Sequence, residues 1–99
     1  MKLPKRFRLH GNTLEVTHNA MLVDDHSALG RYIPTNEQIV ITPHTAGMKV
    51  CADTQGRVFC HELTHAILHH MSHEADEDEV FVDNFGRLLH QALTTMEYK

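Results

Sequence analysis

The sequence has few of the features that mark membrane, secreted or nucleic-acid-binding proteins. It has no tryptophan, three prolines and two cysteines, and no apolar run approaches the roughly 20 residues of a membrane helix. No apolar stretch follows the basic residues 1–6, so they do not resemble a signal peptide. The net charge of −4 argues against nucleic acid as the main partner, because phosphate binding needs a basic surface. We therefore expect no nucleic-acid partner, no membrane association and a cytoplasmic location.

The length and the cysteines indicate one small domain without a disulfide. A chain of 99 residues suffices for a single compact unit, so we predict one domain over 1–99. Cys51 and Cys60, if both are on one helix, point to opposite sides, because each residue turns the helix by about 100°. We expect Cys60 to pack as a buried apolar side chain.

The first half of the chain has the pattern of strands. Apolar and polar residues alternate over 5–9 and 13–17 around a His10-Gly11-Asn12 turn, which predicts a hairpin over 5–17. Residues 31–33 and 38–42 form a second hairpin-like pair, and 19–29 read as a loop with a short helical turn. We predict an antiparallel sheet of three to four strands.

The second half has the pattern of helices. From about Met48 or Asp53 to Met71 the apolar residues lie nearly all round a helix axis, which predicts a helix buried in the middle of the domain. The acidic residues 72–78 read as a solvated loop. A last helix is expected from about 77–80 to Glu97. Strands followed by helices are typical of an α+β domain.

The most informative segment is His61-Glu62-Leu63-Thr64-His65, in a chain with ten histidines. Residues four apart on a helix share a face, so both imidazoles can bind one Zn²⁺ at about 2.0–2.1 Å. Glu62 follows His61 and lies one residue further round the helix, where its carboxylate can act as general base on a zinc-activated water. The motif is short, but it falls in a buried apolar helix, where unpaired polar groups are unfavourable.

A catalytic zinc site needs a third protein ligand, and Glu79 is the best candidate. Glu79 and Asp83 share a polar face of the last helix with Gly86 and His90. Glu79 would bind the zinc, and Asp83 would accept a hydrogen bond from a ligand histidine, His61 in our prediction. Gly86 would allow close approach of the two helices. The alternative third ligands are His69, His70 and His73, which are nearby in sequence, but their place on the same or an adjoining helical segment points them along or away from the site.

These motifs carry a family resemblance. The His61–His65 motif followed by Glu79-x-x-x-Asp83 resembles the gluzincin arrangement, and residues 79–89 resemble the corresponding segment of ImmA/IrrE-type metallopeptidases and short phage- and prophage-encoded zincins. The resemblance covers about residues 30–90. The chain departs from that family in having Val82-Asp83 where the family has Ala-Asn.

The resemblance implies a small zincin-like domain that hydrolyses peptide bonds with zinc. It also implies a protein or peptide substrate lying along an edge strand, which we expect to be residues 38–42. A side chain that stabilises the oxyanion is expected as well. Tyr32, His44 and His90 are the candidates, and the sequence does not choose among them.

Two other functions are compatible with the same residues. One is a zinc-stabilised binding or regulatory module without turnover. Glu62 argues against it, because a structural site gains nothing from a carboxylate beside the water position. The other is a zinc hydrolase of a non-peptide amide or ester, which analogy at the level of the fold does not separate from a peptidase.

Overall fold

The computed structural model describes residues 1–19, 29–45 and 47–98. Most of the loop expected over 19–29 therefore lies outside the described residues. The strands are β1 (Arg6–Leu9), β2 (Asn12–His18), β3 (Gly30–Ile33), β4 (Gln38–Ile41), β5 (His44–Thr45) and β6 (Met48–Lys49). The helices are the 3₁₀ turns η2 (Pro34–Asn36) and η3 (Glu74–Glu77) and the α-helices α2 (Ala52–His70) and α3 (Glu79–Thr95).

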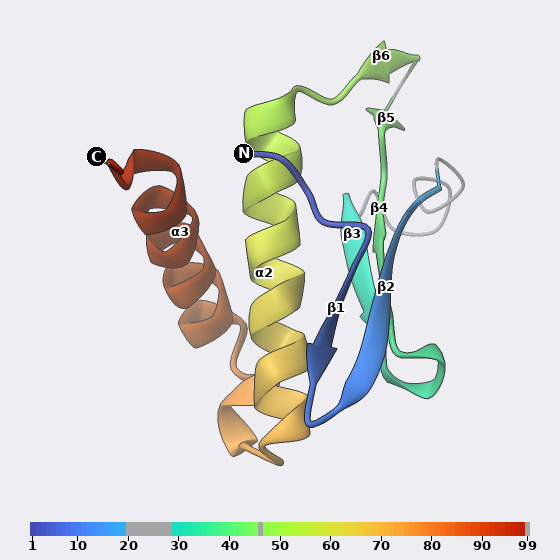
Figure 1. Ribbon diagram of the computed structural model, residues 1–99, viewed down its shortest axis with the longest axis vertical. Coiled ribbons are helices and arrows are strands. Elements are labelled where there is room, and N and C mark those ends of the chain that lie inside the picture. Colours follow the sequence, from blue (N-terminus) through green and yellow to red (C-terminus); the bar gives the residue numbers. More distant parts are fainter. Residues whose placement is uncertain (20–28, 46, 99) are drawn as a thin grey trace.

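The described elements form three layers, and α2 is the middle one. Figure 1 shows α2 between the sheet and α3. Phe59 and Cys60 of α2 are buried and pack in one core with Val16, Ile39 and Ile41 of the sheet. The buried central helix and the α+β class predicted from the sequence are confirmed. Both cysteines are free, Cys51 exposed and Cys60 buried, as expected.

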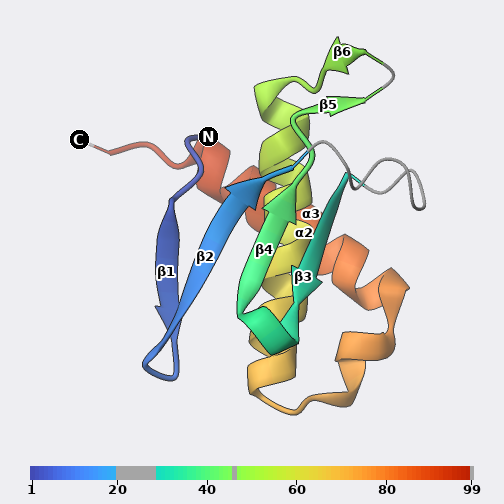
Figure 2. The same cartoon turned by 90° about the vertical axis from the view of Figure 1, so that its right-hand side faces the viewer.

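The main sheet is mixed and has the strand order β1-β2-β4-β3, which Figure 2 shows face on. The β1–β2 hairpin and the β3–β4 pair are antiparallel, as predicted. However, β2 and β4 pair in parallel, with Val16 opposite Ile39, so the prediction of a purely antiparallel sheet was wrong. Whether two strands far apart in the sequence pair in parallel or antiparallel depends on the tertiary structure, which local sequence does not determine.

The prediction that residues 38–42 form an edge strand was also wrong. β4 lies inside the sheet between β2 and β3. Ile39, Val40 and Ile41 are all buried, so this strand is covered on both faces. A continuous apolar run is typical of an interior strand rather than an edge strand. Strand β3 is an edge strand of the described sheet, and the backbone N–H of its Tyr32 donates to Glu62 of α2.

Helix α3 packs on α2 through its small and polar face. Val82, Gly86 and His90 are its buried residues, and a Cβ on Gly86 would lie 3.0 Å from the Cα of His61. The close helix approach predicted at Gly86 is therefore present. The phenylalanine side of α3 is exposed to solvent, with Phe81 at 42 % and Phe85 at 47 %.

None of the helices in the described part of the chain has the length and apolar character needed to cross a lipid bilayer.

Candidate metal centre

The two histidines of the motif lie one turn apart on α2 and face the start of α3. Their ring centroids are 5.1 Å apart. The Nε2 atom of His61 lies 3.4 Å from Oε2 of Glu79, and Nε2 of His65 lies 3.0 Å from Oε1 of the same carboxylate. Each of the three residues offers one ligand atom within 4.8 Å of the other two.

This spacing fits a zinc ion. Two ligand atoms at about 2.1 Å from a tetrahedral zinc are about 3.4 Å apart. The two histidine–Glu79 distances of 3.4 and 3.0 Å are close to that value. Two imidazole nitrogens and one carboxylate are also a donor set that zinc accepts in catalytic sites, with a fourth position left for water. The three residues can therefore hold the metal predicted from the sequence.

Glu79 reaches the histidines because α3 begins at that residue. Asp78 is the N-cap, and its side chain accepts a hydrogen bond from the backbone N–H of Phe81 at 3.1 Å. Such a cap satisfies one of the free N–H groups of the first helical turn and fixes where the helix starts. The short η3 segment carries the chain back from the end of α2 to this point (Figure 1).

A second carboxylate lies behind each histidine. Oδ1 of Asp76 is 2.8 Å from Nδ1 of His65, and Oδ1 of Asp83 is 3.7 Å from Nδ1 of His61. A carboxylate at Nδ1 holds the proton there and leaves the Nε2 lone pair for a metal. The 2.8 Å contact is a hydrogen bond, whereas 3.7 Å is too long for one. Asp83 was expected in this position from the sequence, and Asp76 was not.

These carboxylates change the pKa of His65. Burial lowers the pKa of the ring, but the hydrogen bond to Asp76 and the charges of Glu62 and Glu79 raise it by more, so the net shift is upward. Several negative groups thus surround the imidazoles. Such surroundings favour a cation, either a proton or a metal ion.

Glu62 points toward strand β3. Its Oε1 accepts a hydrogen bond of 3.0 Å from the backbone N–H of Tyr32. Burial raises the pKa of the carboxyl group, and Glu79 adds to this, while the two histidines and the Tyr32 N–H act in the opposite direction. A general base works best when its pKa is near the operating pH, so an upward shift suits that role.

The ligand set borders a cavity of about 400 Å³, here called the metal-side cavity. It is lined by Gly30, Arg31, Tyr32, Pro34, His61, Glu62, His65, Asp76 and Glu79. The cavity therefore lies between α2, the start of α3 and β3, which is an outer strand of the sheet in the described residues. A molecule bound there would touch the metal ligands, the candidate base and the edge strand together.

Of the three oxyanion candidates, Tyr32 borders this cavity. Its hydroxyl donates a hydrogen bond of 2.9 Å to Glu37, and burial followed by this contact raises the pKa of the phenol, which stays protonated at neutral pH. His44 is in β5 and lines neither cavity beside His61. His90 is buried at Gly56, with Nε2 3.7 Å from Asp53, and also lines neither.

The other histidines near the end of α2 have different contacts. His70 Nε2 lies 2.8 Å from Glu37, and the ring of His69 lies 5.7 Å from that of Tyr32. His73 accepts a hydrogen bond from the backbone N–H of Ala75. Within the described residues, His61, His65 and Glu79 are the one set found with ligand atoms close enough for a metal.

No family model, curated protein or solved structure matches this chain. The resemblance to ImmA/IrrE-type metallopeptidases therefore stays a prediction carried by the motif residues.

Proposed function

We propose that this chain is a zinc-dependent peptidase. His61, His65 and Glu79 would hold the metal, and Glu62 would act as general base. The observation that carries the proposal is the convergence of both Nε2 atoms on one carboxylate, with Glu62 facing the same cavity. A purely structural zinc site fills its four positions with protein ligands and has no use for a free carboxylate beside an open position.

When bound, zinc would supply a water with a pKa of about 7 and would polarise the carbonyl group of the peptide bond. The protein supplies the remaining functions. Glu62 takes the proton of the attacking water and delivers it to the leaving amine. Asp76 holds a proton on Nδ1 of His65, so that the Nε2 atom of this ring remains a ligand, and the charge of Asp83 lies 3.7 Å from Nδ1 of His61. The neutral Tyr32 hydroxyl lies at the cavity wall, where rotation away from Glu37 would let it donate to a developing oxyanion.

The substrate would lie along β3 as an added strand. The N–H of Tyr32 points away from β4, beyond the edge of the sheet, since it donates to Glu62 rather than to β4. Alternate residues of a strand share this direction, so Gly30 and Tyr32 present their backbone groups to the cavity. Because the N–H of Tyr32 already donates to Glu62, an extended peptide would pair with the other outward backbone groups of Gly30 and Tyr32 by β-augmentation. The peptide-binding edge is thus proposed at β3, in place of residues 38–42.

The test uses Glu62→Gln in the zinc-loaded protein, with denatured proteins and a peptide library as substrates. We expect wild type to cleave and Glu62→Gln to retain zinc while losing about 10²–10⁴-fold in rate, the usual contribution of a general base. Glu97→Gln is the matched control, because Glu97 is exposed near the chain end. Its rate should equal that of wild type.

Two results would overturn the peptidase proposal. Absence of peptide cleavage by the zinc-loaded wild type would favour the binding or regulatory module. Cleavage confined to small esters or non-peptide amides would favour the zinc hydrolase of non-peptide substrates.

Both free cysteines are compatible with a reducing compartment such as the cytoplasm, which is the location proposed from the sequence.

A further inference from the structure

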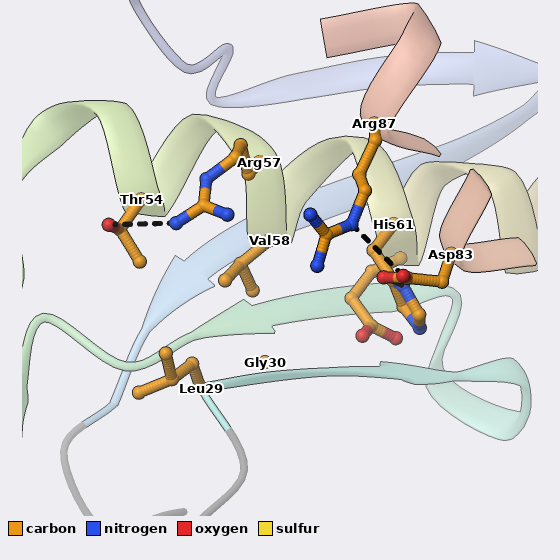
Figure 3. Close-up of a pocket in the computed structure, with 9 residues that line it drawn as sticks. Leu29, Gly30, Thr54, Arg57, Val58, His61, Asp83 and Arg87 are labelled. Carbon is orange, nitrogen blue, oxygen red and sulfur yellow. Dashed lines mark hydrogen bonds and ion pairs between the residues drawn. The ribbon is translucent and has the colours of Figure 1, made fainter. Parts of the chain in front are cut away.

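A second cavity, of about 430 Å³, also borders Glu62, and Figure 3 shows the residues that line it. We call it the arginine cavity. Its lining is Leu29, Gly30, Thr54, Arg57, Val58, His61, Glu62, Asp83 and Arg87. It shares Gly30, His61 and Glu62 with the metal-side cavity, so the two are adjacent along β3. A substrate strand lying on β3 would pass both.

Two guanidinium groups border the arginine cavity from different helices. Arg57 comes from α2, one turn before His61, and Arg87 comes from α3, one turn after Asp83. Figure 3 shows both side chains on the helix side of the cavity, with Val58 between them and Leu29 across from them on the strand side. Carboxylates border both cavities: Glu62 and Asp83 line the arginine cavity, whereas the metal-side cavity is lined by Glu62, Asp76 and Glu79 with Arg31 as its one arginine.

The contacts of the two arginines leave donors for a ligand. Arg87 uses Nε to hold Asp83 at 3.0 Å, and a guanidinium has four further N–H groups on its Nη atoms. Arg57 has weaker partners: the Thr54 hydroxyl at 3.4 Å and Asp53 at 3.9 Å. Since Asp83 offsets the charge of Arg87, the charge of Arg57 is the one that nearby carboxylates offset least.

We propose that the arginine cavity is a specificity subsite for a substrate carboxylate on the C-terminal side of the cleaved bond. This inference rests on the proposed peptidase function. An arginine pairs with a carboxylate through parallel hydrogen bonds, which gives both direction and selectivity. The apolar part of the cavity, Leu29 and Val58, would contact the carbon chain that carries the acid.

The chain direction of β3 determines which side of the cleaved bond reaches the arginine cavity. The strand runs from Gly30 to Ile33, and the arginine cavity is at its beginning, next to Leu29. A substrate paired antiparallel, the more stable arrangement, runs the opposite way. Its residues after the cleaved bond therefore lie toward Leu29.

The helix geometry gives the distance from the cleaved bond. One helical turn, about 5.4 Å, separates Arg57 from His61. An extended strand advances about 3.3 Å per residue, so the carboxylate belongs one or two residues beyond the cleaved bond. A glutamate or aspartate side chain could supply it, and so could the free C-terminus of a short peptide.

Three matched peptides separate these sources. The first has Glu one or two residues after the cleaved bond and an amidated end, the second has Gln there and an amidated end, and the third has Gln and ends in a free carboxylate. Cleavage is measured as kcat/KM with the zinc-loaded wild type. Binding is measured by fluorescence anisotropy with zinc-loaded Glu62→Gln, which is expected to bind without turnover.

We expect about a two- to fivefold preference for one of the acidic peptides over the neutral one, the size expected for an ion pair at a partly exposed arginine such as Arg57, whose side chain is 44 % exposed. Arg57→Met should reduce this ratio toward one, and Arg57→Lys should keep part of it. Arg57→Glu should favour a peptide with Lys at that position. Arg8→Met is the matched control, since Arg8 is exposed on β1 at the opposite sheet edge, and it should keep the full preference.

Equal binding and cleavage of all three peptides by proteins with intact Arg57 would overturn the subsite, and so would a full preference in Arg57→Met. Circular dichroism of each variant checks that it is folded. The failures are distinguishable. Cleavage without acid preference removes the subsite and leaves the peptidase. Acid-selective binding that depends on Arg57, without cleavage by wild type, removes the peptidase and leaves the subsite.

Discussion

Because Gly86 has no side chain, α3 can approach the backbone of His61 on α2 closely. Gly86→Ala therefore tests whether this close approach positions the candidate metal ligands. The added Cβ would lie 3.0 Å from Cα and 3.1 Å from N of His61. Ordinary contacts between carbon atoms are about 3.5–4.0 Å, so α3 must move away from α2 by a few tenths of an ångström. The atoms in the way are helix backbone, which cannot rotate aside as a flexible side chain can.

Two effects of opposite sign determine the stability of this variant. Overpacking costs about 1–3 kcal/mol, while replacing glycine by alanine within a helix gains about 1 kcal/mol. We expect a net loss of about 1 kcal/mol in the free energy of unfolding of the metal-free protein. Glu79 is on the same helix and should retreat from His61 and His65. Metal–ligand distances tolerate only about 0.2 Å, so zinc affinity should fall about 10–100-fold.

Urea unfolding of the metal-free protein and zinc titration against a chromophoric chelator measure these two quantities. Asn84→Ala is the control, because Asn84 is exposed on the same helix and lines neither cavity beside His61. It should raise helix propensity slightly without changing zinc affinity. If Gly86→Ala were about 1 kcal/mol more stable than wild type with unchanged zinc affinity, the reasoning on helix approach would be refuted.

The remaining predictions concern the ligands and the cysteines. Zinc at 100 times its Kd should stabilise the folded protein by about 2.7 kcal/mol, which for this size raises Tm by about 10–20 °C in calorimetry. Glu79→Ala should lose most of this increase and His69→Ala none of it; equal increases in both would remove Glu79 as a ligand. Asp76→Ala should weaken zinc binding about 10–100-fold in the chelator titration, because it removes the hydrogen bond behind a ligand histidine; an unchanged Kd would contradict that role. The Thr54 hydroxyl lowers the pKa of exposed Cys51, so this thiol has more reactive thiolate at pH 7–8 and iodoacetamide should label it. Buried Cys60 should react only after unfolding. Mass spectrometry that found Cys60 labelled first would contradict the described packing.

The helical half of the fold was predictable from the sequence because its signals are local. The period of the apolar residues indicated both α-helices, and the four-residue spacing placed His61 and His65 on one face. The polar face of α3 then indicated Glu79, since a carboxylate stripe on a packed helix needs a partner. These inferences required no knowledge of how distant segments meet.

The sheet and the outer part of the site were less predictable, because they depend on tertiary structure. The run Ile39-Val40-Ile41 already had the composition of an interior strand, yet it was assigned to an edge. Asp76 lies in an acidic segment that the helix dipole explains adequately, so the sequence did not distinguish it from its neighbours. Arg57 and Arg87 belong to different helices, and their common cavity becomes visible when the helices are packed.

The most direct test of the account is the position of the metal. Crystals grown with one equivalent of zinc, measured at the zinc absorption edge, should give a single anomalous peak between the Nε2 atoms of His61 and His65 and the carboxylate of Glu79. A peak elsewhere, for example between Glu37 and His70, with none at the motif histidines would contradict the central claim.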